Sequence, residues 1–249
     1  MHARLGALVG AVAIFACPAG AAQAVQSARL QVSLSPERLG ASTTIAFDFQ
    51  ITAPNDELPS ALTLLKVRLP PGMGIDTSGL ARCRRALLVH GPQGCSRNSR
   101  VGTGSVDVKV PLGNVIRPEK AALTVFNGPR QRGHATLLFY AAGRLPIATQ
   151  LVFRGVIIPS QLGQTIEAAI PLIPTLPEAP DAAIVAMSST LGTRALAYYR
   201  TVGHRRVRFT PRGATLPARC PAGGFPFSAF FGFSDATSTA APAIVPCPG

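Results

Sequence analysis

The chain has no tryptophan and only three tyrosines among its 249 residues. Sugar-binding modules and proteins that bind single-stranded nucleic acid use exposed aromatic rings as stacking surfaces. Twelve phenylalanines are present, but most of them fall in alternating apolar and polar segments. We expect the densest group to form core, and it comprises Phe225, Phe227, Phe230, Phe231 and Phe233. The composition therefore argues against both of these classes of binding protein.

The sequence also lacks the common catalytic motifs. Beyond the first 24 residues its histidines are His90, His134 and His204, and no two lie within forty positions of each other. This spacing is not that of zinc hydrolases, which place two ligands on one helix face. No Gly-x-Ser-x-Gly turn occurs, and the nearest approach, residues 102–105, precedes an alternating strand where glycine suits a bulge or a tight turn. We therefore expect no metal, no cofactor and no catalytic residue, although a hydrolase with an unconventional site built from distant residues stays open.

No apolar run is long enough to span a bilayer, which takes about 20 residues in a helix. Residues 1–24 have the parts of a signal peptide, with Arg4, an apolar stretch over 5–16 and the ending Ala22-Gln23-Ala24. We expect cleavage before Val25, secretion and no transmembrane anchor. Lipid attachment at Cys17 is the rival, and the neighbouring residues fit that signal poorly.

Cysteine is scarce, and four of the five residues form two close pairs, Cys83 with Cys95 and Cys220 with Cys247. Neither pair has the two-residue spacing of a zinc knuckle or a thiol oxidoreductase. Local disulfides persist in an oxidising compartment, which agrees with export. We expect both pairs to be structural disulfides.

Period-two alternation dominates the remaining chain and helical periodicity is rare. Ile45, Phe47, Phe49 and Ile51, for example, alternate with polar or small residues. Twelve strands are predicted, over 44–51, 65–69, 106–110, 122–126, 135–140, 147–153, 165–170, 183–188, 195–201, 206–210, 225–233 and 240–245. This pattern predicts an all-β fold, an antiparallel β-sandwich of the immunoglobulin-like or jelly-roll-like kind, over residues 25–249. The proline-rich run 171–180 is either a boundary between two packed lobes or a crossover within one domain.

Acidic residues are few, 11 against 24 basic ones, and the loss of Arg4 with the leader leaves a net charge of +12. The positive electrostatic field of a protein with this net charge attracts anionic surfaces. The basic residues cluster near the end of the chain, where Arg206 and Arg208 share one face of a predicted strand. The candidate anion-contacting residues are Arg200, Arg205, Arg206, Arg208 and Arg212. The alternative is a charged edge that prevents aggregation between sheets.

Scattered motifs resemble those of a class of exported proteins from high-GC actinobacteria. They are Leu69-Pro70-Pro71-Gly72, then Cys83 and Cys95, then Ser99-Arg100-Val101-Gly102, and later Arg219-Cys220-Pro221 and Val245-Pro246-Cys247. The resemblance spans most of the mature chain, although Ser96 stands where the class often has proline. It implies a β-rich build, local disulfides and an extracellular or surface location, and it implies no activity.

Together these features predict an exported, non-enzymatic β-sandwich with a structural or binding role at the cell envelope. The expected partner is an anionic envelope polymer or another surface protein, and no specific nucleic acid is expected. The two alternatives are the secreted hydrolase and a basic adhesin that binds anionic envelope polymers.

Overall fold

A computed structural model describes residues 26–194 and 196–248 as an all-β structure with antiparallel strand pairing. The predicted signal peptide, residues 1–24, and the rival lipidation site Cys17 lie outside the described residues. No helix in the described ranges is long and apolar enough to cross a membrane. The fold class predicted from the alternation is therefore confirmed.

Fifteen strands and four short 3₁₀ segments make up the described structure. The strands are β1 (Ser27–Ser35), β2 (Ser42–Thr52), β3 (Leu62–Arg68), β4 (Gly74–Asp76), β5 (Arg100–Leu112), β6 (Val115–Asn127), β7 (Ala135–Ala142), β8 (Gln150–Ser160), β9 (Gly163–Ala169), β10 (Ala183–Leu191), β11 (Tyr198–Val202), β12 (Arg205–Phe209), β13 (Gly213–Thr215), β14 (Phe225–Phe233) and β15 (Ser238–Val245). The 3₁₀ segments are η1 (Pro54–Asp56), η2 (Arg85–His90), η3 (Pro92–Gly94) and η4 (Arg97–Ser99).

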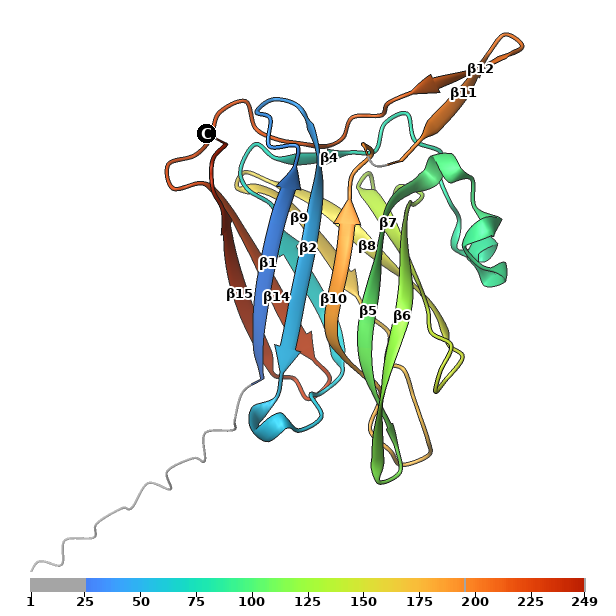
Figure 1. Cartoon of the computed structure of the whole chain (residues 1–249), viewed down its shortest axis with the longest axis vertical. Coiled ribbons are helices and arrows are strands. Elements are labelled where there is room, and N and C mark those ends of the chain that lie inside the picture. Colours follow the sequence, from blue (N-terminus) through green and yellow to red (C-terminus); the bar gives the residue numbers. More distant parts are fainter. Residues whose placement is uncertain (1–25, 195, 249) are drawn as a thin grey trace, which may run out of the picture.

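Thirteen of the strands form one sheet that folds over on itself into two layers (Figure 1). Its order is β15-β14-β3-β9-β8-β7-β6-β5-β10-β2-β13-β4, with β1 paired to β2. One layer contains β1, β2, β10, β5 and β6, and the other contains β7, β8, β9, β3, β14 and β15 (Figure 1). The hydrogen-bonded pair β6–β7 joins the layers at one edge, and β1 runs beside β15 at the other.

The core lies between the layers and follows the alternation of the sequence. Ile45, Phe47, Phe49 and Ile51 of β2 are all buried, because they point to the same face of a half-covered strand. The Phe49 and Phe231 rings meet edge to face across the layers, with 5.1 Å between their centroids. Such pairs add about 0.5–1.5 kcal/mol beyond the burial of their area. Of the Phe-rich group predicted as core, Phe230 alone is partly exposed, at 37%.

The proline-rich run leads from β9 to β10, two strands of the same large sheet. It therefore crosses from one layer to the other (Figure 1). The Ala182 N–H donates to the Ile173 carbonyl at 2.9 Å, and the Thr175 hydroxyl donates to the Pro180 carbonyl at 2.9 Å. These bonds give the crossover a defined shape without strand pairing, which its prolines would prevent.

Both predicted disulfides are present. Cys220–Cys247 joins the two chain segments at the open end of the β14–β15 hairpin. Cys83–Cys95 lies within residues 80–98, a segment that we call the excursion. Cys83, Cys95 and Leu88 pack against Leu138 and Tyr140 in a second small core on the outer face of the sheet. Strand β7 is consequently buried on both faces.

Candidate functional site

The predicted basic residues lie on a two-stranded ribbon that stands apart from the large sheet (Figure 1). Strands β11 and β12 pair antiparallel from Tyr198↔Phe209 to Val202↔Arg205. The turn is Gly203-His204, and Gly203 has φ +58°, in the left-handed region that glycine enters without steric cost. We call residues 198–209 the arginine arm.

The register of the arm distributes its arginines over both faces. Directly paired residues share a face, so Arg206 and Arg208 lie with Tyr199 and Thr201, as predicted for the first two. Arg200 and Arg205 lie on the opposite face. The five candidate arginines therefore do not form one stripe, because the two-residue period of a strand separates Arg200 from Arg206.

Arg212 belongs to neither face of the arm. It follows β12 and lies close enough to Asp76 to act on that carboxyl. Hydrogen bonds from Ser78 contribute most to holding the pKa of Asp76 below its ordinary value, and the charges of Arg212 and Arg130 add to them. Arg212 therefore lies outside the arm, and its contact with an anion stays a prediction.

Two aromatic rings support the arginines of the arm. The Arg206 guanidinium lies 4.1 Å from the centroid of the Tyr199 ring, and that of Arg200 lies 5.8 Å from the Phe209 ring. A cation over a ring at an exposed site contributes about 0.5–1 kcal/mol. Stacking leaves the N–H groups at the edge of the guanidinium free to donate in its plane. The arm can thus present ordered donors to an anion.

The root of the arm is fixed to the sandwich. Tyr198 is buried, at 1% exposure, and its hydroxyl donates to the Arg100 carbonyl at 2.7 Å. Burial raises the pKa of Tyr198 to about 12. Asn98 of η4 accepts from the Tyr199 N–H at 3.1 Å through Oδ1 and donates to the Tyr199 carbonyl through Nδ2. The excursion 80–98 and the arm are therefore joined although they lie about a hundred residues apart.

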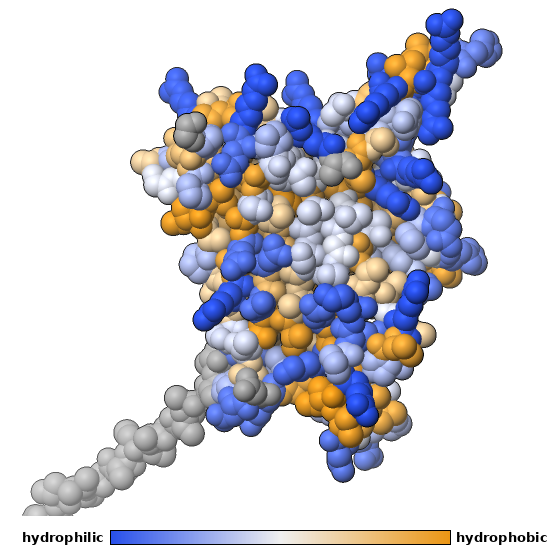
Figure 2. Space-filling view, in the orientation of Figure 1, coloured by the Kyte–Doolittle hydropathy of each residue, from blue (hydrophilic) through white to orange (hydrophobic). Residues whose placement is uncertain are grey.

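The joined surface is basic and contains no acid. Neither 77–106 nor 182–234 contains Asp or Glu. Besides the arm, the excursion contributes four exposed arginines, Arg82, Arg84, Arg85 and Arg97. Strongly hydrophilic side chains surround the arm in the space-filling view (Figure 2). Among the described residues the ion pairs are Lys66–Glu167 and Lys120–Asp107, at 2.9 Å each, and neither uses an arginine.

The other sequence candidates are placed differently. In residues 26–194 and 196–248, no group of three or more His, Cys, Asp or Glu side chains could hold a metal ion. Gly102 and Gly104 occur where β5 passes close to β10, since a Cβ on either would lie 2.1 Å from a β10 carbonyl oxygen. Close backbone approach thus explains both glycines, and a bulge beside Gly102 agrees with the prediction.

Sequence reasoning missed Asn98 and the supporting roles of Tyr199 and Phe209. Tyr198 and Tyr199 do occupy opposite faces of one strand, as the period of two requires. The diagonal placement of Tyr199 and Arg206 could be found from a hairpin register centred on Gly203-His204. Asn98 has no comparable local signal, because its partner is distant in sequence.

No protein-family model matches this chain, and no curated protein or solved structure is similar enough to count as a match.

Proposed function

We propose that the protein is a secreted, non-enzymatic binding protein of the cell envelope whose arginine arm contacts an anionic polymer. The observation that supports this most is the surface shared by the arm and the excursion 80–98. It presents eight exposed arginines from two acid-free segments, held together by Asn98. The two disulfides are compatible with an extracellular location.

Arginine suits this role because its planar group binds phosphate or carboxylate through two parallel hydrogen bonds. Within the part of the chain that the structure describes, the guanidinium groups of this surface lack carboxylate partners, so an incoming anion does not have to displace one. The ribbon also exposes both of its faces, which allows a flexible polymer to contact Arg200 and Arg205 as well as Arg206 and Arg208.

The competing proposal is that the arginines only prevent the arm from pairing with other sheet edges. The two proposals differ in what charge reversal does. If the arm binds polymer, Arg206→Glu with Arg208→Glu weakens co-sedimentation with anionic wall fractions at low salt. If the arm is only protective, binding is unchanged, because glutamate also keeps the strand edges charged.

The experiment compares this double variant with Arg29→Glu plus Arg117→Glu, which changes net charge equally at exposed positions on β1 and β6. Polyphosphate serves as a defined probe beside the wall fraction. We expect the arm variant to lose about tenfold or more in affinity, since charged hydrogen bonds are worth about 1.5–3 kcal/mol each. An equal loss in both variants would indicate a general charge effect and would contradict the proposed role of the arm.

A further inference from the structure

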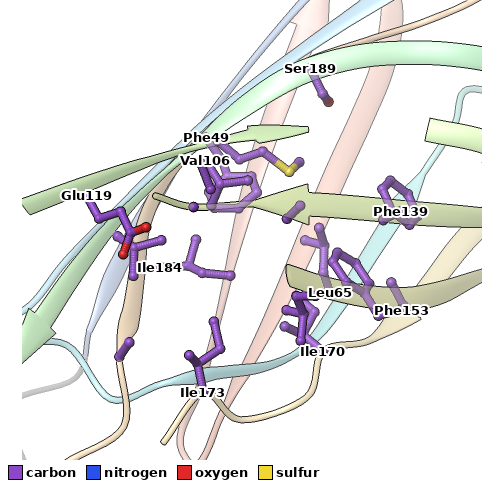
Figure 3. A pocket seen from close by; sticks show the side chains of 18 of the residues that line it. Phe49, Leu65, Val106, Glu119, Phe139, Phe153, Ile170, Ile173, Ile184 and Ser189 are labelled. Atoms are coloured by element: carbon purple, nitrogen blue, oxygen red, sulfur yellow. The ribbon is translucent and has the colours of Figure 1, made fainter. Parts of the chain in front are cut away.

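A cavity opens between the two layers, and Phe49 of β2 is one of the residues that line it (Figure 3). Its volume is about 80 Å³, and its walls are almost wholly apolar. One water needs about 10–15 Å³ of such space, so the cavity has room for several water-sized groups. Interiors of folded domains are normally close-packed, with few voids larger than a water. Apolar cavities of this kind stay dry, so water is a poor occupant.

The partial burial of several lining residues shows that the cavity opens to solvent. Leu151 and Phe153 of β8 face the cavity, yet both are only half-buried. Ile173 of the proline-rich crossover and Gly143 of the β7–β8 loop also line it and are likewise half-buried. The cavity therefore opens toward these two connecting segments.

Among the described residues that line the cavity, Glu119 is the only acid, and it lies on the inner face of β6 beside Val108. Its carboxyl lies at one side of the cavity, with the rings of Phe139 and Phe153 at the other side (Figure 3). The Glu119 side chain is half-buried, but its Oε1 atom is buried and makes no hydrogen bond of normal geometry with any described residue. Loss of solvation raises the pKa of Glu119, against a smaller opposing effect of the Arg144 and Ile147 N–H groups. An acceptor of this kind is costly to leave unpaired.

The dimensions favour a chain over a ring. The lining follows β10 from Ile184 to Leu191, roughly 23 Å at about 3.3 Å per residue. A small volume spread along such a length leaves a narrow space. It encloses only a few CH₂ groups, since a water-sized group takes about 30 Å³ in a liquid, so a longer chain lies partly in the opening beside Leu151, Phe153 and Ile173.

We propose that this cavity binds an unbranched aliphatic chain whose head group donates a hydrogen bond to Glu119, as an alcohol or an amine does. The chain occupies the apolar interior, where removal of its CH₂ groups from water drives binding. The head group stays at the open end and supplies the partner that Oε1 lacks. This site is independent of the arginine arm, and neither proposal requires the other.

The test uses the oxidised full chain from an exporting host, titrated calorimetrically with octylamine, octanol and octanoic acid. We expect the amine and the alcohol to bind, and octanoate to bind about tenfold more weakly because two carboxylates would face each other. Absence of binding by both the amine and the alcohol would overturn the proposal. Preference for octanoate would overturn the role of Glu119.

Two matched pairs of variants locate the site. Ala121→Leu fills the cavity beside Glu119, whereas Ala122→Leu adds the same group on the outer face of the same strand. We expect Ala121→Leu to lose about tenfold in affinity for the amine and the alcohol, and Ala122→Leu to keep its affinity. Equal affinities of the two variants would place the ligand elsewhere. If Ala121→Leu fails to fold, Ala141→Val on the opposite layer replaces it.

Glu119→Gln tests the head group and is compared with Glu167→Gln, whose carboxyl pairs with Lys66 outside the cavity. Glu119→Gln should lose about tenfold in octylamine affinity while binding octanol nearly as before. Glu167→Gln should leave both affinities unchanged. An unchanged octylamine affinity in Glu119→Gln would show that Glu119 does not contact the ligand.

Discussion

Asn98 and Tyr199 are joined by two hydrogen bonds that use both amide atoms of the asparagine side chain. One partner lies in the disulfide-closed excursion and the other in the arginine arm. The two basic segments are consequently held as one surface.

Asn98→Ala should loosen the arm without unfolding the sandwich. Two neutral hydrogen bonds of about 1 kcal/mol each are lost, so amide exchange over 198–209 should become roughly thirtyfold faster. Hydrogen–deuterium exchange by mass spectrometry measures this directly. Asn114→Ala, at the exposed β5–β6 turn, is the control and should leave the arm unchanged. Identical arm exchange in Asn98→Ala and the unsubstituted protein would refute the anchoring role.

The two disulfides should differ in what they contribute to stability. Loop closure alone predicts about 3 kcal/mol for Cys83–Cys95 and slightly more for the longer Cys220–Cys247 loop. Cys83 and Cys95, however, are buried in the second small core, whereas Cys247 is exposed. We therefore expect replacement of the first pair by alanine to lower the free energy of unfolding more than replacement of the second. Urea titration of the two double variants measures both losses of unfolding free energy. A larger loss for the Cys220–Cys247 pair would contradict the packing of Cys83 and Cys95 in the second small core.

Neighbouring phenylalanines of β14 should respond very differently to truncation. Phe231 is fully buried against Phe49, so Phe231→Ala should cost about 3–5 kcal/mol in unfolding free energy. Phe230 points to the outer face, and Phe230→Ala should cost about 1 kcal/mol or less. Similar costs for the two variants would show that the strand faces are assigned wrongly.

Tyr198 should give the protein a distinct alkaline response. Burial raises the pKa of Tyr198 from 10 to about 12, so between these values the unfolded state loses a proton that the folded state keeps. The free energy of unfolding should therefore fall as pH rises through this window. Ultraviolet titration should show a late component near pH 12 that disappears in Tyr198→Phe. Identical titration curves for Tyr198→Phe and the unsubstituted protein above pH 11 would contradict the burial.

Local alternation was sufficient to predict most of the strands. It worked because a half-buried strand has a fixed period of two, as β2 and β14 show. The prediction omitted β1, although Leu30, Val32 and Leu34 carry the same signal. It also omitted β4 and β13, which are three residues each and too short to show a period.

What could not be predicted depends on contacts between distant residues. The pairing of Asn98 with Tyr199 and the split of the arginines between two faces follow from tertiary placement and hairpin register. The cavity depends on the small volumes of Ala121, Ala141 and Ala168, which come from different strands and carry no local signal of being neighbours. The sequence nevertheless pointed to five arginines between positions 200 and 212, of which four lie in the arm.

The most direct test of the proposed function is to map where a bound polyanion protects the protein. Hydrogen–deuterium exchange is measured on the oxidised chain with and without saturating polyphosphate, at low and at high salt. We predict protection of residues 80–98 and 198–209 together at low salt, and its loss at high salt because exposed charges are screened. Protection confined to other strands, or none at saturation, would contradict the proposal that the arginine arm is the binding site.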